Sequence, residues 1–186
     1  MSDVEDHVRA TIRYWVWGGY YGPRDFDQMI EDIIEEGVTT EWAQSIVQEE
    51  IARKTAAEAH WPARTDCDRL DEAFSRLDSV GICAVQNAGY TSSDGHEEVE
   101  LALDQRGRDR CHGYCFFHGQ DLERAIDGHG LMLAFGDLRD DVKRSASVAQ
   151  QVCSEMRAAG FAVQWNGDVG QRIEITSIDW KRRRKR

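Results

Sequence analysis

The segment spanning residues 81–137 constrains the fold more than any other part of this 186-residue chain. It contains three short apolar runs, ICAVQ at 82–86, YCFF at 114–117 and LMLAF at 131–135. Short apolar runs bounded by turn residues are typical of buried strands. Helical patterns lie between these runs, so the segment predicts alternating strands and helices.

The residues on either side of this segment predict more helices and a final hairpin. Apolar residues recur at helical spacing over residues 3–17 and again after Pro23 and after Thr39 or Thr40, which predicts an N-terminal helical layer. Another helix starts at Thr65 or Asp66, and a long one occupies most of residues 140–160. Residues 161–165 and 172–178 then flank NGDVG, a turn sequence typical of a β-hairpin.

The predicted fold class is therefore α/β, also describable as α+β. We expect a mixed sheet of about five strands covered by helices, together with the N-terminal helical layer. The predicted domains are a helical layer over residues 1–60, packed on the rest, an α/β domain over 61–180, and a basic disordered tail over 181–186. No Ser/Gly-rich linker separates the first two.

Charge and hydropathy exclude several function classes. The chain holds 34 Asp and Glu against 23 Lys and Arg, and its net charge is −11 although Lys181–Arg186 are all basic. Such an acidic body repels nucleic acid, so nucleic-acid binding is expected only of the tail, if anywhere. The sequence also has no apolar run of about 18 residues and begins with an acidic segment, which predicts a cytoplasmic protein without a membrane partner.

Several longer strings carry a family resemblance. They are WVWGGYYGPRDFDQMIEDI, HWPARTDCDRLDEAF, GICAVQNAGYTSSDGHEEV, GYCFFHGQDLERAIDGHGLMLAFGD and GQRIEITSIDW. In order and spacing they resemble a bacterial family, frequent in actinobacteria, that is known only as a domain of unknown function. The resemblance covers essentially the whole chain and implies no reaction, cofactor or ligand.

One cluster of residues has the chemistry of a zinc site. Cys111, His112, Cys115 and His118 are close in sequence, and thiolates and imidazoles are the usual zinc ligands. If this segment is a strand, both cysteines point to one face and both histidines to the other. We therefore expect no metal here, and the five cysteines of the chain are interpreted as reduced thiols.

A candidate binding crevice lies where the predicted strands end. In parallel sheets, ligands bind beyond the carboxyl ends of the strands, and polar residues follow each of the three runs: Gln86 and Asn87, then His118, Gln120 and Asp121, then Asp137. The loop at 90–96 is expected to fold over the same crevice. The candidate ligand-binding residues are Tyr90, Asp94, His96, His118, Gln120 and Asp121.

Each candidate also has a structural interpretation. Asp94 and Asp121 are suitable helix N-caps, and His118 could simply bond a backbone carbonyl. A base formed by His118 with Asp94 or Asp121 is possible, but no catalytic motif is present and no catalytic residue is assigned.

Three functions remain open from the sequence. The first is a non-enzymatic interaction or regulatory module that binds a protein through the aromatic run at 13–22, RYWVWGGYYG, or through its acidic helices. The second is a small-molecule or metal binder, or an enzyme, that uses the crevice around His118. The third is an acidic mimic or inhibitor of a nucleic-acid-binding protein. A contiguous exposed aromatic patch without a deep polar pocket favours the first function, and a concave pocket lined by His96, His118 and Gln120 favours the second.

Overall fold

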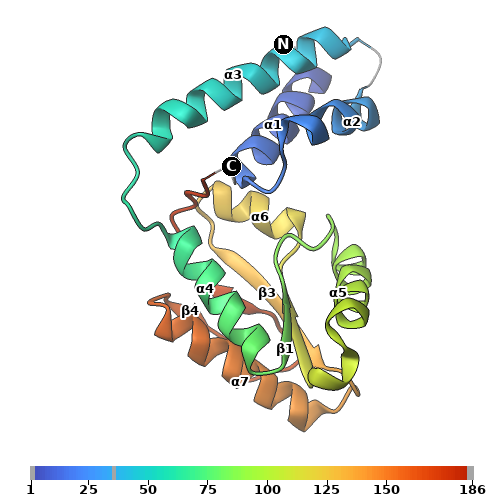
Figure 1. Cartoon of the computed structure of the whole chain (residues 1–186), viewed down its shortest axis with the longest axis vertical. Coiled ribbons are helices and arrows are strands. Elements are labelled where there is room, and N and C mark those ends of the chain that lie inside the picture. Colours follow the sequence, from blue (N-terminus) through green and yellow to red (C-terminus); the bar gives the residue numbers. More distant parts are fainter. Residues whose placement is uncertain (1–2, 35–36, 184–186) are drawn as a thin grey trace. The chain divides into compact units, whose positions relative to one another are not determined.

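A computed structural model describes residues 3–34 and 37–183. The chain divides into two compact units. The helical unit comprises Met1–Thr65 with Lys181–Arg186, and the sheet unit comprises Asp66–Trp180. Figure 1 shows the helices and strands of each unit.

The helical unit consists of α1 (Asp3–Gly18), α2 (Pro23–Ile33) and α3 (Thr40–Glu58). Pro23 occupies the first turn of α2, where its missing N–H has no helical partner to lose. The Thr39 hydroxyl caps α3 by accepting from the backbone N–H of Trp42. The apolar faces of the three helices form one buried cluster that includes Val8, Ile12, Val16, Phe26, Ile30, Ala43, Ile46 and Val47.

The sheet unit contains the predicted alternation of helices and strands. Its elements are α4 (Asp66–Ser79), β1 (Ile82–Val85), α5 (Ser92–Arg106), the 3₁₀ turn η1 (Arg108–Arg110), β2 (Gly113–Phe116), α6 (Gly119–Ile126), β3 (Leu131–Asp137), α7 (Val142–Ala158), β4 (Val163–Gln164) and β5 (Ile173–Ile175). The strands form one five-stranded sheet in the order β1-β2-β3-β5-β4. β1 and β2 are parallel, and the other pairs are antiparallel. The predicted mixed sheet, its helical cover and the final hairpin are therefore confirmed.

Helices cover both faces of this sheet. On one face, Phe117 packs edge-on against Phe74 of α4, with ring centroids 5.7 Å apart. On the other face, α5 approaches Phe116 so closely that a Cβ on Gly95 would lie 2.2 Å from the phenyl ring. Only glycine permits this approach, since real Cβ contacts are longer than 3 Å. α6 lies on the same face as α5, beside β3.

The outer edge of β1 is closed by side chains. Asp78 accepts a hydrogen bond from the N–H of Ala84 at 2.9 Å, and Arg106 donates to the carbonyl of Ala84 at 3.3 Å. Arg106 and Asp78 are also paired at 2.6 Å. Occupied backbone groups cannot pair with another chain, so this edge is protected against strand addition.

The boundaries of the units differ from the predicted domains. The division falls after Thr65 rather than after residue 60, and residues 181–183 belong with the helical unit. Arg182 is buried, with its guanidinium carbon 4.5 Å from the centroid of Tyr20, and Arg183 donates to the carbonyl of Pro62 at 2.6 Å. Residues 181–183 of the predicted tail are thus packed, and 184–186 lie outside the described residues. Among the described helices, none combines the length and apolar character needed to cross a membrane.

Candidate functional site

The two helices that follow β1 and β2 begin in the same way. In α5, the Asp94 carboxylate accepts from the backbone N–H of Thr91 at 2.8 Å, and in α6 Asp121 accepts from the N–H of His118 at 3.1 Å. Each aspartate is the third residue of its helix and bonds back to the N-cap, as in a capping box. The interpretation of Asp94 and Asp121 as N-caps is therefore wrong: the caps are Thr91 and His118. Hydrogen bonds from the backbone and hydroxyl of Thr91 lower the pKa of Asp94.

The loops that precede these helices lie side by side. The N–H of Gly119 donates to the carbonyl of Gly89 at 2.9 Å, and that of Gln120 donates to the carbonyl of Tyr90 at 3.3 Å. A Cβ on Gly119 would come within 2.7 Å of the Tyr90 ring. His118 and Gln120 thus lie next to the loop at 90–96, as the parallel pairing of β1 and β2 predicts.

The predicted site residues differ in their exposure. Tyr90 is 54% exposed, and Gln120 and His96 are also on the surface. His96 packs edge-on against Tyr114 and Phe116 of β2, with ring centroids 5.4 and 5.1 Å away. Only His118 and Asp121 are buried, and these two contact each other.

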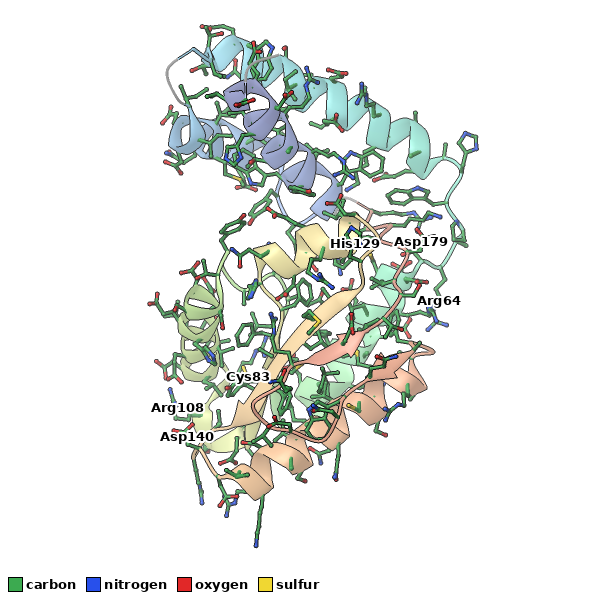
Figure 2. The ribbon with its side chains drawn as sticks, turned by 180° about the vertical axis from the view of Figure 1, so that it is seen from behind. Arg64, Cys83, Arg108, His129, Asp140 and Asp179 are labelled. Carbon is green, nitrogen blue, oxygen red and sulfur yellow. The ribbon has the colours of Figure 1, made fainter. Side chains whose placement is uncertain are left out.

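Asp137 does not lie in this region, contrary to the prediction. Because β3 runs antiparallel to β2, its last residue pairs with Gly113 at the start of β2. The Asp137 carboxylate accepts from the backbone N–H of Arg139 at 2.8 Å and so shapes the turn into α7. In Figure 2, His129 before β3 and Asp140 after it appear at opposite ends of the sheet unit.

Asp121 and His118 both contact Arg172, the residue immediately before β5. Asp121 binds Arg172 through both carboxylate oxygens, one at 2.9 Å from Nη1 and the other against Nη2. Nη1 also approaches His118 Nε2 at 3.4 Å, and Nη2 donates to the carbonyl of Met132 at 3.2 Å. Four of the five guanidinium N–H groups are thus in use, and the buried Nε has no partner among the described residues.

This geometry determines the state of His118. Burial lowers the pKa of His118, and the neighbouring Arg172 charge lowers it further, while Asp121 and Asp94 raise it. In the neutral ring, Nε2 accepts from Arg172 and the proton is therefore on Nδ1. Nδ1 lies 3.2 Å from Asp121 but is not aligned for a hydrogen bond, and it is buried without another partner among the described residues. His118 thus supports Arg172 as a neutral acceptor.

Arg172 lines a pocket beside strands β3, β5 and β4. The pocket has a volume of about 540 Å³. Its walls come from β3, β4, β5, the β4–β5 loop and the end of α7: Met132, Arg157, Val163, Gln164, Trp165, Asn166, Gln171, Arg172 and Glu174. Met132 pairs with Glu174, which pairs with Gln164, so these three lie on one face of the sheet. This face is the one that carries α6, since Arg124 of α6 reaches Glu174 at 3.8 Å.

The loop that borders the pocket is held by its own hydrogen bonds. The indole N–H of Trp165 is shared between the carbonyls of Asp168 at 3.0 Å and Gln171 at 3.2 Å. Phe135 packs edge-on against the indole, with centroids 5.6 Å apart and planes at 87°. Trp165 is therefore fixed and half-buried, and its indole packs on the face of the sheet that carries Phe135, opposite Met132 and Glu174.

The cysteines and histidines near β2 do not converge. Cys111 packs on the α5 side of the sheet against the buried cluster that includes Cys83 and Phe116, whereas Cys115 lies on the other side near Cys153 of α7. The prediction that Cys111 and Cys115 share a face is wrong because Cys111 precedes the strand, so the alternation of side chains does not extend to it. Within residues 3–34 and 37–183, no three His, Cys, Asp or Glu side chains form a potential metal site. Burial raises the pKa of the Cys115 thiol, as it does for Cys83 in the interior of the unit (Figure 2).

The aromatic run at 13–22 does not form an exposed patch. Its tyrosines and tryptophans are all half-buried, and Trp15, Trp17 and Tyr21 pack against the core of the helical unit. The Trp17 indole donates to the buried Glu50 carboxylate at 2.8 Å. These aromatic side chains therefore stabilise the helical unit itself.

The sequence analysis missed every residue that lines the pocket. Arg172 and Glu174 alternate with the buried Ile173 and Ile175, which is the ordinary pattern of a strand with one solvated face. The one available signal was Asp121, a carboxylate in the first turn of the helix after an apolar strand, because a buried carboxylate requires a cation.

Searches among curated proteins and among solved structures returned no significant match to this chain. One family profile, described as a domain of unknown function (DUF6891), matches residues 1–184. That match covers both units and the elements around the pocket, and the chain therefore belongs to the DUF6891 family.

Proposed function

We propose that the sheet unit is a small-molecule-binding module whose ligand occupies the pocket beside Arg172. One observation carries the proposal: an open, mainly polar hollow of about 540 Å³ is bordered by an arginine that two buried residues hold in place. Pockets for small molecules are typically about 300–1,000 Å³ and combine apolar walls with a few fixed polar groups.

The cost of the arrangement supports a role beyond packing. Burying Asp121 and His118 requires their desolvation, and buried ion pairs add little net stability compared with apolar residues of similar size. Their effect is to fix the Arg172 guanidinium at the pocket wall. Sites whose side chains are oriented by supporting residues bind with less loss of conformational entropy.

Small probes can test the proposal directly. We expect benzoate, benzylamine or benzyl alcohol, added to ¹⁵N-labelled protein, to give saturable shifts centred on the pocket. A probe of this size should bind with a Kd on the order of 1 mM. The variant Gln164→Trp, which replaces an exposed side chain in the pocket lining by a much larger one, should strongly reduce these shifts.

Gln150→Trp provides the matched control, since Gln150 is an exposed residue of α7 outside the pocket lining. It should leave the shifts unchanged. The proposal is wrong if none of the three probes gives saturable shifts at the pocket, or if Gln164→Trp binds them as well as Gln150→Trp does.

A further inference from the structure

We propose that the ligand is a planar aromatic or heteroaromatic ring that carries an anionic oxygen group, either a carboxylate or a phosphate. This inference rests on the proposed function, because it names the class of molecule that the same pocket accepts. Two features of the pocket lining lead to it: the way Arg172 is held beside Met132, and the free donors of Arg157.

Arg172 presents the flat face of its guanidinium group to the pocket, and its N–H donors are not available to bind an anion. Its Nη1 and Nη2 donate in the plane of the guanidinium to Asp121, His118 and the Met132 carbonyl, and Nε is buried. The side chain nevertheless remains 32% exposed. With the in-plane donors directed into the protein, the ligand meets the face of the guanidinium and its methylene stem. Guanidinium faces stack on planar rings.

Met132 extends this surface. A polarisable thioether from Met132 lies in the same wall and favours contact with aromatic rings. A ring that contacts these groups gains both area burial and stacking.

Arg157 supplies the charge that an anion needs. Among the described residues, its side chain makes one hydrogen bond, 3.3 Å from Nη2 to the carbonyl of Val163, and its other side-chain N–H groups have no partner there. The other charges at the pocket are balanced, since Asp121 pairs with Arg172 and Arg124 lies 3.8 Å from Glu174. The pocket therefore carries one uncompensated positive charge, and charge-assisted bonds to a carboxylate or phosphate are its strongest available contact.

Four probes separate the ring from the charge: benzoate, phenyl phosphate, cyclohexanecarboxylate and benzylamine. Titrations followed by ¹⁵N–¹H spectra should show benzoate binding about fivefold more tightly than cyclohexanecarboxylate, because only the planar ring stacks. Benzylamine should bind about tenfold more weakly than benzoate, because its charge repels Arg157. Comparing benzoate with phenyl phosphate then distinguishes the two anionic groups.

A variant pair identifies the residue that binds the anion. Arg157→Gln should weaken benzoate binding by about tenfold, while Arg144→Gln, which removes another exposed arginine of the same helix, should have no effect. Melting temperatures of both variants confirm that the fold is intact.

Each failure has a separate meaning. If cyclohexanecarboxylate binds at the pocket as tightly as benzoate, the inference that the ligand has a planar ring is wrong. If benzylamine binds as tightly as benzoate, or if Arg157→Gln keeps full benzoate affinity, the inference that the ligand has an anionic group is wrong. In either case the pocket remains a binding site. Loss of all shifts at the pocket, for every probe, contradicts the proposed function itself and the present inference with it.

Discussion

At the scale of single residues, His118 is the group whose charge matters most to the site. It lies between Asp121, which favours its protonated form, and Arg172, which disfavours it. Burial is the largest influence, and it lowers the pKa of His118 below its ordinary value of 6.5. The ring is therefore neutral in the folded protein near neutral pH.

A lowered pKa in the fold makes stability depend on pH. As the pH falls below 6.5, the unfolded chain takes up a proton at His118 while the folded chain does not. The contribution of neutral His118 is thus complete above pH 6.5 and is lost as the pH falls toward its folded pKa, by at most about 1.4 kcal/mol per pH unit. Urea unfolding at pH 7.5, 6.5 and 5.5 should show wild type losing more stability than His118→Gln.

The glutamine keeps an acceptor for Arg172 but has no proton to gain, so the difference between the two proteins isolates this one group. The same replacement at the exposed His129 controls for the loss of an imidazole from this unit. Parallel loss of stability in wild type and His118→Gln would show that His118 is not held neutral by the fold.

At the scale of elements, the starts of α5 and α6 provide a natural comparison. Both helices begin with a capping box whose third residue is an aspartate. Among the described residues, the Asp94 carboxylate hydrogen-bonds only within its own loop, whereas Asp121 is buried and also binds Arg172. The same local sequence signal therefore serves helix initiation alone in one case and helix initiation with ion pairing in the other.

Replacing each aspartate by asparagine separates these roles. Asparagine retains an oxygen for the capping bond but no charge, so Asp94→Asn should change the unfolding free energy little. Asp121→Asn should cost about 3 kcal/mol, because it leaves Arg172 beside the pocket without its counter-ion. Urea unfolding of both variants at pH 7 tests this, and equal losses would show that the Asp121–Arg172 pair adds nothing beyond capping.

Element boundaries were predictable because the local signals agree. The apolar runs of β1, β2 and β3 and the glycines after α4 and α7 determine where elements begin and end. Strand direction was not predictable in the same way, since LMLAF has the same apolar pattern in either direction. Asp137 was therefore assigned to the wrong end of the sheet.

The site was predictable only in part, for a related reason. His118 and Asp121 follow a buried strand directly, so their position at its end is a local consequence of sequence. Their partner Arg172 is 51 residues further along the chain from Asp121. A contact of that range depends on β5 pairing with β3, which periodicity alone does not specify.

At the scale of the whole molecule, residues 181–183 near the C-terminus pack against residues of the helical unit. Arg182 lies over the Tyr20 ring, and a Cβ on Gly19 would come within 2.9 Å of the Arg182 side chain. Gly19 has a φ of +80° and ends α1 in a conformation that other residues rarely adopt. Residues from the two ends of the chain thus form one structure.

Removing this segment should destabilise the helical unit. A chain that ends at Trp180 loses the stacking of Arg182 on Tyr20 and the hydrogen bonds of Arg183 to the carbonyls of Pro62 and Ala63. A partly desolvated cation–π contact and two exposed hydrogen bonds together correspond to about 2 kcal/mol. We expect thermal unfolding followed by far-ultraviolet circular dichroism to show a lower melting temperature for that chain.

A chain that ends at Arg183 is the matched control, because it removes three of the six basic residues and keeps every contact described above. If both shortened chains have the same melting temperature as the full-length protein, residues 181–183 do not contribute to stability. If both melt lower by the same amount, the loss comes from the net charge removed with residues 184–186 rather than from the packing of Arg182 and Arg183.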